Sequence, residues 1–500
     1  MSQKRKLMSP LSILMLVIVL AAVATWLIPS GRYDRLSYTE GTDFTYSRED
    51  GDTLLPFTQQ TLDSLHINIP LANFQSGAIK KPVSVPGTYK KTAASRQGFL
   101  KVIQAPVKGI YESIEIILFV LVIGGFMQVF NESGAMVKGV RALSETMKGR
   151  EAWLIIILTF LFALGGASFG MAEEGFVFYP ILIPIFLAAG YDLLVPVAVI
   201  FGGTQLGTLT SFTNPFSTII ASNAAGVSWT DGLTERLIMF ALTCIIYIWY
   251  VVRYAQKVRK DPTKSLLYGF NDTAAIKSML PEDTTADSKP DTRTKLLLLL
   301  FFATFAVMIY GVVKLDWWLL EMSTLFLGSA ILFAVMLRLS ESLFIEQFIK
   351  GAESLLGVAF IIGVARGVSI VLNDGNISDS IIYNAANLTG NMPPALFIVM
   401  MLLIYMVFTL FISSSSGMAV LTMPIMGSLA IMVNVPGREI VNAYLYGMGI
   451  MGFITPTGLI LPALAISHVN IKAWWTFIYP LIIILFIVCA ACLVIGIYLK

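Results

Sequence analysis

The sequence has little charge, and this excludes a soluble globular protein. Charged residues make up 13% of the 500 residues and hydrophobic residues 56%, whereas soluble domains carry about 25% charged residues. Several apolar runs exceed the roughly 18 residues that span a bilayer. The net charge of +3 gives no indication of a nucleic-acid partner. We therefore expect a polytopic membrane protein with the lipid bilayer as its surroundings.

The residues that build common cofactor and catalytic sites are scarce. The three cysteines, Cys244, Cys489 and Cys492, lie in apolar segments without metal-ligand spacing, which argues against a disulfide framework and a zinc site. The two histidines, His66 and His468, are far apart in the sequence, and no P-loop motif is present. No nucleophile is paired with a base as an enzyme would need. We expect no enzymatic activity, no metal site and no organic cofactor.

Apolar and polar segments divide the chain. We expect a first transmembrane helix within 1–31, an extracytoplasmic polar loop over 32–108, a first half over 109–256, a cytoplasmic linker over 257–295, a connecting helix over 296–316 and a second half over 317–500. The first apolar run is long for a signal peptide and no Ala-x-Ala site follows it, so it is read as a retained helix. Lys4, Arg5 and Lys6 place the N-terminus in the cytoplasm.

Two apolar segments, 152–190 and 394–433, are interrupted. Each either crosses the membrane twice or enters it and returns to the same side without crossing. Each arm of 152–190 has only about 13 to 15 residues, which is short for a bilayer at 1.5 Å per residue. This favours re-entrant hairpins, preceded by lateral helices near 134–150 and 376–391. The predicted fold is an all-α inverted repeat with about nine transmembrane helices and two re-entrant hairpins that enter from opposite sides.

Four interruptions by small and polar residues occur at corresponding places in the two halves, about 245 residues apart. They are GGASFGMAEEG at 165–175, TSFTNP at 210–215, SSSSGMA at 413–419 and ITPTG at 454–458. Broken helices in transporters expose backbone groups that coordinate solute and ions, and lipid permits them only where they line a protein cavity. The pattern predicts a secondary active transporter. An ion channel is the alternative from another class.

The interruptions supply hydroxyl and amide groups suited to a solute carboxylate and a sodium ion. The candidate residues of this kind are Ser168, Thr210, Ser211, Thr213, Asn214, Ser413, Ser414, Ser415, Ser416, Thr455 and Thr457. The alternative is that these small residues only permit close helix packing.

Glu173 and Glu174 are adjacent carboxylates in an apolar hairpin, where each charge costs about 2.5–3.5 kcal/mol on insertion scales. They are candidates for a proton carrier, a sodium ligand or a counter-charge for a cationic substrate, and with Asn214 for ion coupling. The alternative is an interfacial pair that reaches water. Arg366, inside the eighth span, should be paired or face the cavity, and Asp374 should lie at the extracytoplasmic surface. Tryptophans at 317, 318, 474 and 475 are read as an interfacial belt.

These residues resemble the YfcC family, also labelled C4-dicarboxylate anaerobic carriers, within the ion transporter superfamily. The resemblance rests on FALGGASFGMAEE at 162–174, NPF at 214–216, SSSSG at 413–417 and KDPTKSL at 260–266. It implies a bacterial inner-membrane carrier and a homodimer, with a scaffold domain and an elevator-type transport domain that bears the hairpins. The implied hairpin tips are 168–175 and 413–417, and the implied unwound breaks are 213–215 and 455–457.

The resemblance and the residues disagree on the substrate. The Ser-Asn-Thr tripeptide of divalent-anion symporters is missing from both tips, and some relatives in Gram-positive bacteria are taken to be arginine–ornithine exchangers. A cationic amino acid needs acidic groups, which Glu173 and Glu174 supply, whereas a dicarboxylate needs basic groups, of which only Arg366 is available. We favour an amino acid such as arginine or ornithine, with a C4-dicarboxylate as the alternative. The coupling ion is sodium or a proton, and the cycle is symport or exchange.

Overall fold

The computed structural model describes residues 10–498 except 40, 68, 76–78, 80–81, 136–137, 140–141, 143–149, 169, 269–291, 316, 318, 391 and 413. Within these residues the chain is mostly helical, and eight helices are long and apolar enough to cross a membrane. Seven of them are whole elements, and the eighth is the stretch Leu356–Asp374 of a longer helix. A multi-pass membrane fold is therefore confirmed.

Residues 31–98, the small domain, follow helix α1 (Pro10–Leu27) and contain the described strands. Strand β1 (Gly31–Arg32) pairs with β6 (Lys90–Lys91). The other four form an antiparallel sheet in the order β4 (Gly51–Leu55), β3 (Phe44–Arg48), β2 (Arg35–Ser37) and β5 (Val83–Ser84). Short helices α2 (Gln59–Ser64) and α3 (Leu71–Gln75) complete the domain. The prediction of an all-α chain is wrong for this segment.

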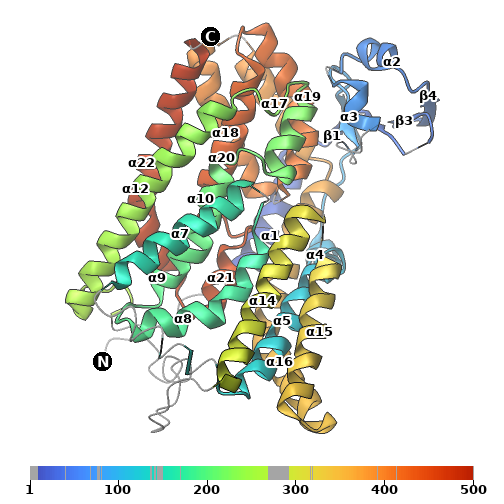
Figure 1. The fold of residues 1–500 in the computed structure, drawn as a ribbon. Helices are drawn as coiled ribbons and strands as arrows, with labels where there is room; N and C mark the ends of the chain where they lie inside the picture. Colours follow the sequence, from blue (N-terminus) through green and yellow to red (C-terminus); the bar gives the residue numbers. More distant parts are fainter. Residues whose placement is uncertain are drawn as a thin grey trace, which may run out of the picture.

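The small domain folds around its own aromatic core. Phe44 and Phe74 are buried and meet edge to face at 5.1 Å between ring centroids. Arg48 pairs with Gly51 across a two-residue turn, where Gly51 has a φ of +126° that glycine adopts without strain. The domain lies at the same end of the molecule as α17 (Ser378–Thr389) (Figure 1).

The first half of the membrane part begins at α4 (Phe99–Glu112), inside the segment predicted to be a polar loop. It continues as α5 (Ile114–Asn131), α7 (Glu151–Ser168), η1 (Glu173–Phe178), α8 (Tyr179–Ala188), α9 (Leu194–Val197), η2 (Ala198–Gly202), α10 (Gly203–Leu209), η3 (Pro215–Ile219), α11 (Ile220–Ala224), α12 (Leu233–Lys260) and η4 (Pro262–Lys264). The predicted lateral helix near 134–150 falls largely outside the described residues, as does most of the predicted linker.

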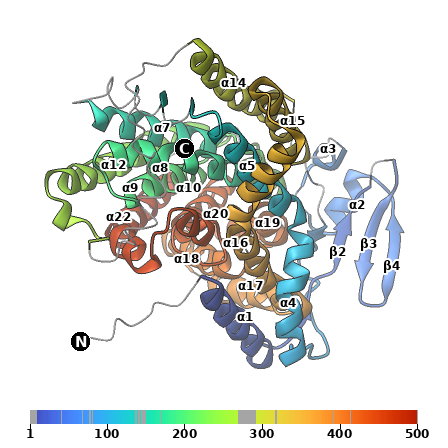
Figure 2. The same cartoon turned by 90° about the horizontal axis from the view of Figure 1, so that it is seen from below.

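The second half comprises α14 (Thr292–Lys314), α15 (Leu319–Leu337), α16 (Glu341–Asp374), α17, α18 (Pro394–Phe411), α19 (Ser415–Met432), α20 (Gly437–Gly452), α21 (Ile460–Ile466) and α22 (Ile471–Tyr498). Helix α17 falls within the lateral helix predicted near 376–391. Figure 2 shows α14 and α15 at the edge of the molecule next to α5. Phe301 of α14 stacks on Phe130 of α5 with centroids 4.2 Å apart.

The helices pack closely because glycines lie at their crossings. Helices α5 and α16 meet at Gly124 and Gly351, where a Cβ on either residue would lie within 2.4 Å of the other's carbonyl oxygen. Helix α7 packs against α10, and α18 packs against α20. A Cβ on Gly207 would meet the Ala163 carbonyl oxygen at 2.1 Å. Small residues let membrane helices approach to this distance.

The α5–α16 crossing gives a stability prediction. Gly351→Ala should destabilise the protein by about 1–3 kcal/mol, because overpacking a close contact costs this much and the new Cβ would lie 2.2 Å from the Gly124 carbonyl oxygen. Gly357→Ala, in the same helix, is the control, since its Cβ meets nothing within 4 Å. The measurement is thermal unfolding in detergent. Equal unfolding temperatures for the two variants would contradict the close contact between α5 and α16 at Gly351.

Candidate functional site

The first helix break lies between α10 and η3, at residues 210–214. Pro215 occupies the first position of η3 and Asn214 is its N-cap, accepting hydrogen bonds at Oδ1 from the backbone nitrogens of Phe216 (2.9 Å) and Ser217 (3.2 Å). Asn and Pro are favoured at these two positions. The segment before α10, η2, is a π-helix, a feature frequent at functional sites.

Asn214 also binds the first hairpin tip, which lies between α7 and η1. Its Nδ2 donates to the Gly166 carbonyl at 3.1 Å, and the neighbouring Thr213 hydroxyl donates to the Ser168 carbonyl at 2.9 Å. Gly170 in the tip has a φ of +84°, and a Cβ there would lie 2.8 Å from Asn214 Oδ1. The break thus supplies donors for carbonyls that the end of α7 leaves without helical partners.

The two glutamates follow directly after this tip, in the first turn of η1. Glu174 is 6% exposed, and its Oε2 accepts a hydrogen bond from the backbone nitrogen of Ala172 at 2.8 Å. Glu173 is half-buried. A Cβ on Gly175, the next residue, would lie 3.4 Å from the Ile200 side chain of η2. The Glu174 carboxylate therefore stabilises the tip, whereas the Glu173 carboxylate lies next to it.

The second hairpin has its tip between α18 and α19. Ser414 accepts a hydrogen bond at Oγ from the backbone nitrogen of Gly417 at 3.1 Å, which caps the N-terminus of α19. The Ser414 and Ser416 hydroxyls are 3.5 Å apart. Tyr444 of α20 donates to the Ser415 carbonyl at 2.9 Å. Ser413 lies outside the described residues.

The second break, at residues 453–459, is bonded to the second tip. The hydroxyls of Thr455 and Thr457 are 2.9 Å apart, and Thr457 donates to the Leu410 carbonyl at the end of α18 at 3.3 Å. Trp474 is fully buried and its indole nitrogen donates to the Phe453 carbonyl at 2.8 Å. The interpretation of Trp474 as a belt residue is therefore wrong, whereas Trp475 is exposed.

Contacts between the halves join these four segments into one region. The Ser415 hydroxyl donates to the Phe216 carbonyl at 3.4 Å, so the second tip meets the first break. Gln205 of α10 donates to the Gly449 carbonyl of α20 at 3.0 Å. Next to the first break, Ser211 bonds to the hydroxyls of Ser217 and Thr218. Thr210 is also buried there, where its hydroxyl donates to the Leu206 carbonyl.

The other candidate charges lie elsewhere. Arg366 of α16 pairs through Nε with Glu112 Oε2 of α4 at 3.1 Å, with both side chains at least 36% exposed. Asp374, at the end of α16, pairs with Lys108 at 2.7 Å. Both pairs tie α4 to α16. Glu173 and Glu174 are the only charged residues in the sequence of the four segments, 165–175, 210–217, 410–417 and 453–459.

The motif at 260–266 fastens the base of the first hairpin. Asp192, in the turn after α8, accepts hydrogen bonds at Oδ2 from Tyr254 (2.7 Å) and Ser265 (2.6 Å). Burial raises the pKa of the Asp192 carboxyl, and these two donors offset part of that rise. Arg259 makes a two-bond ion pair with Glu151 at the start of α7, both bonds being 2.9 Å long. Ser265 of the motif, and Arg259 just before it, therefore have a structural role.

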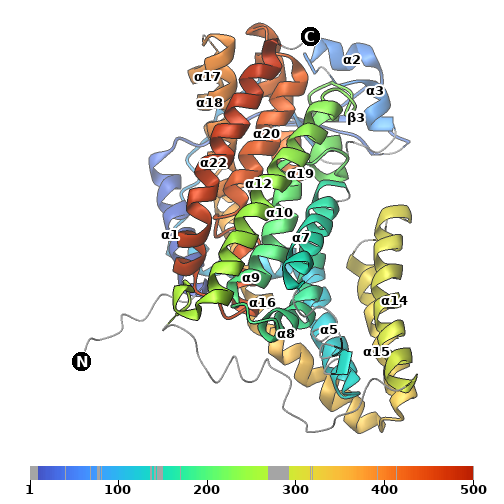
Figure 3. The same cartoon turned by 60° about the vertical axis from the view of Figure 1, so that its left-hand side comes forward.

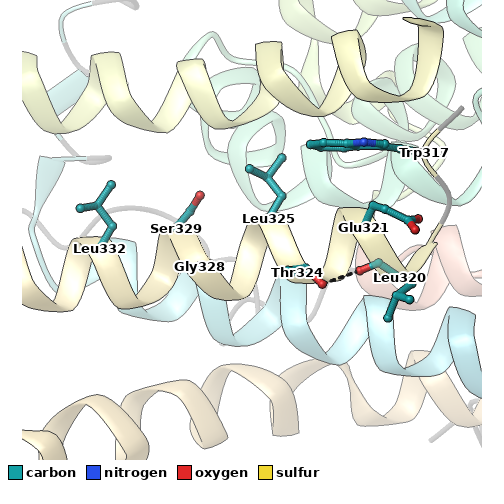
Figure 4. Close-up of a pocket in the computed structure, with 8 residues that line it drawn as sticks. All are labelled: Trp317, Leu320, Glu321, Thr324, Leu325, Gly328, Ser329 and Leu332. Atoms are coloured by element: carbon teal, nitrogen blue, oxygen red, sulfur yellow. Dashed lines mark hydrogen bonds between the residues drawn. The ribbon is translucent and has the colours of Figure 1, made fainter. Parts of the chain in front are cut away.

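A groove of about 550 Å³ lies along α15, far in the sequence from the tips and breaks (Figure 4). Its polar groups are few: besides the Glu321 carboxylate, Thr324 donates to its own helix at the Leu320 carbonyl, and Ser329 accepts from Thr304 at 3.2 Å. Leu320 is 69% exposed, as suits a surface toward lipid or another subunit. Among the described residues, no group of three metal-ligating side chains is close enough to hold a metal ion.

Comparison with known proteins gives the family. The model of the DcuC family, "C4-dicarboxylate anaerobic carrier", matches residues 7–498. An uncharacterized protein of Haemophilus influenzae is 38% identical over 493 residues, covering 98% of this chain and 97% of its own. The "Putative basic amino acid antiporter YfcC" of Escherichia coli is 29% identical over 480 residues, covering 93% and 91%.

Two solved structures also align with the whole chain at low similarity. The MtrF efflux pump of Neisseria gonorrhoeae has 16% identity and a TM-score of 0.40, covering 99% of this chain and 96% of its own. The YdaH transporter of Alcanivorax borkumensis has 12% identity and a TM-score of 0.40, covering 97% of both chains. By its family match over nearly the full length, the chain belongs to the DcuC family of membrane transporters.

Proposed function

We propose that this protein is a secondary active carrier of a small cationic metabolite, a basic amino acid such as arginine or ornithine. The observation that carries the proposal is the charge of the four joined segments, where Glu173 and Glu174 are the only charged residues. Carboxylates in an apolar hairpin cost free energy unless a cation compensates them. A guanidinium or ammonium group supplies that compensation, and a dicarboxylate does not.

The polar groups of the four joined segments suit the other end of an amino acid. Asn214 and Ser414 cap helices that begin at the break and at the second tip, and helix N-termini attract a carboxylate. The same four segments carry the hydroxyls of Ser168, Thr213, Ser415, Ser416, Thr455 and Thr457, and Ser413 belongs to the second tip in sequence. A sodium ion or a proton, bound at Glu173, Glu174 or Asn214, would couple the cycle.

The packing supports an inverted repeat. Helix α1 packs on α16 while α15 packs on α5, and α5 crosses α16 through one glycine from each. In the same way α7 pairs with α10 and α18 with α20. Helix α14 has no counterpart in this scheme and would be the connecting helix. Two halves related in this way place their helix breaks together near the bilayer midplane, as in many carriers.

Re-entrant hairpins fit the arrangement. The prediction of short arms is wrong for α7, because α7 and α18 are each long enough to cross a bilayer, yet each ends in a tip bonded to a helix break. Helix α8 lies toward one end of the molecule and α17 toward the other (Figures 1 and 3). The hairpins would then enter from opposite sides, and movement of the hairpin-bearing part against the scaffold would give alternating access in an elevator-type cycle.

The location and assembly belong to the same proposal. We propose that the protein lies in the bacterial inner membrane with its N-terminus in the cytoplasm. We also propose that it forms a homodimer. The basic residues at 4–6 support this orientation. Mass measurement of the detergent-solubilised protein tests the dimer, and a monomer at all concentrations would contradict it.

A C4-dicarboxylate is the competing substrate, favoured by the description of the family. It would require basic groups at the site. Arg366, the candidate for this role, is instead paired with Glu112 away from the four segments. The description of the Escherichia coli relative as a basic amino acid antiporter favours the cationic substrate.

Counter-flow in proteoliposomes tests the proposal. Labelled arginine should enter faster when ornithine is inside, because a carrier returns loaded more readily than empty, while labelled succinate with internal succinate should show no such stimulation. Only a carrier shows trans-stimulated exchange, so the assay also separates a carrier from a channel. Stimulated succinate uptake would replace the cationic substrate by the dicarboxylate, and uptake without trans-stimulation would indicate a channel.

A further inference from the structure

Two broken helices have the same length and lead into the two breaks. The first, Leu194–Leu209, consists of α9, η2 and α10 with 4, 5 and 7 residues. The second is α20, which has 16 residues. A buried carboxylate lies at the outer end of each helix, the end away from the break: Asp192 is 8% exposed and Glu439 is 1% exposed.

Asp192 is held by residues at the end of α12 and just after it. Its Oδ2 accepts hydrogen bonds from the hydroxyls of Tyr254 (2.7 Å) and Ser265 (2.6 Å), and its Oδ1 accepts one from the backbone nitrogen of Leu194 (3.2 Å). The Tyr254 ring also packs on Phe477 near the start of α22, with centroids 5.0 Å apart. A helix of the second half therefore contacts the side chain that holds Asp192.

Glu439 is held in the same way at the end of α22. A Cβ on Gly496 would lie 2.4 Å from Glu439 Oε1, so glycine leaves the space that the carboxylate fills. Arg438 Nε lies 3.4 Å from Oε1, and Asn442 Nδ2 donates to Oε2 at 3.4 Å. Arg438 Nε also pairs at 3.2 Å with Glu235 in the first turn of α12. A helix of the first half therefore contacts the side chain that holds Glu439.

The two carboxylates are related as an inverted repeat requires. They lie about 245 residues apart, which is the spacing of the helix breaks, and the helices α12 and α22 that hold them have 28 residues each. Helices α8 and α9 lie toward one end of the molecule and the C-terminus toward the other (Figures 1 and 3). A buried carboxylate costs free energy even when it is paired, so its presence at both equivalent positions indicates a shared role.

We propose that Asp192 and Glu439 are equivalent anchors, each of which fixes the outer end of a broken helix so that its break stays beside a hairpin tip. This inference rests on the proposed function. A helix of 16 residues is about 24 Å long, so both carboxylates are positioning residues that act through the helix. Helix α20 shows the connection: Arg236 of α12 donates to Asn442 at 2.8 Å, and Tyr444 donates to the second tip.

Amide variants test both anchors. Asp192 and Glu439 each use both carboxylate oxygens, so in Asp192→Asn or Glu439→Gln one donor must face an NH2 group. Each variant should raise the half-saturating solute concentration at least about tenfold, because misplacing a site by about 1 Å can cost about a hundredfold. The measurement is counter-flow with whichever solute the unmodified protein exchanges. Glu353→Gln, at an exposed glutamate of α16, is the control.

The kinetics separate a positioning role from a merely structural one. A structural role would reduce the amount of folded carrier, which lowers the maximal rate and leaves the half-saturating concentration unchanged. That result, or unmodified kinetics in both amide variants, would overturn the proposal.

Gly496→Ala displaces the Glu439 carboxylate without removing it, so it tests the second anchor even if Glu439→Gln does not fold. It should raise the half-saturating concentration to a similar extent, and the double variant should be no worse than either single one, since both changes remove the same contact. Gly328→Ala is the control, because its Cβ meets nothing within 4 Å. Gly496→Ala with the kinetics of Gly328→Ala would overturn the anchor at Glu439.

Hydrogen–deuterium exchange of the backbone separates this inference from the proposed function. If the unmodified protein exchanges neither arginine nor succinate, the proposed function fails, and amide exchange alone judges the anchors. Asp192→Asn should speed amide exchange at 210–214 and Glu439→Gln at 453–459, each at least about tenfold, because local opening becomes more frequent. The amides of α16 should keep their rates. Unchanged rates at both breaks, or equal acceleration along the whole chain, would overturn the proposal.

Discussion

Glu173→Gln should abolish trans-stimulated arginine exchange while leaving the protein folded and inserted. The side chain keeps its shape and loses only its charge. Loss of one partner from a buried charge pair costs about 2–5 kcal/mol, so the exchange rate at low substrate should fall about 30-fold or more. Glu173 is half-buried beside the tip, and no other charged residues than the two glutamates occur in the four segments. The measurement is counter-flow with labelled arginine.

Glu174→Gln should abolish exchange as well, because it removes the second of the two negative charges. Its Oε2 accepts the Ala172 backbone hydrogen bond, and an amide oxygen can still accept that bond, so the tip should keep its shape. Glu115→Gln is the matched control, because Glu115 is an exposed glutamate in the first turn of α5. Wild-type exchange in both the Glu173 and Glu174 variants would remove these residues from the site.

The helix interruptions were predictable because their signals are local. Asn214 followed by Pro215 is a pair typical of a helix N-terminus. Ser414 likewise caps α19, since its hydroxyl accepts a hydrogen bond from the Gly417 nitrogen. The break at 453–459 carries Pro456 and Gly458 within three residues, a combination that favours a turn over a continuous helix. These features depend on backbone preferences of a few neighbouring residues, so the sequence alone is sufficient to place them.

Other features depend on residues distant in the sequence and were missed or misread. Arg366 was predicted to be paired or to face the cavity, and the sequence could not decide between the two because its partner, Glu112, lies 254 residues away in α4. Tryptophan is typical of the interfacial belt, but the Trp474 indole nitrogen donates to the Phe453 carbonyl of the second break. Gln205, a polar side chain within an apolar helix, was a usable signal for the contact between α10 and α20.

The small domain was missed for a different reason. Its strands have two to five residues, too few to show the alternation that identifies a strand. The hairpin β3–β4 did carry a signal, since Phe44 and Tyr46 alternate with polar residues and Gly51 follows the turn. A polar segment between two spans gave no reason to look for a folded unit.

Asn214→Ala should also abolish exchange, because this side chain is the bond between the first break and the first tip. Removing a helix N-cap costs about 0.5–2 kcal/mol, and leaving the buried Gly166 carbonyl without a donor costs about 1–3 kcal/mol more. The tip would separate from the break, so exchange should fall by more than the loss of stability explains. Counter-flow and thermal unfolding in detergent, measured together, test this.

Asn214→Asp shows which half of the side chain matters. The carboxylate can still accept hydrogen bonds from the nitrogens of Phe216 and Ser217, so the cap is kept, but it cannot donate to the Gly166 carbonyl. Stability should therefore stay closer to wild type than in Asn214→Ala, while exchange is lost in both. Asn131→Ala, at an exposed asparagine at the end of α5, is the control. If Asn214→Asp exchanged at the wild-type rate, the cap would be its whole function, and the joined tip and break would not form the transport site.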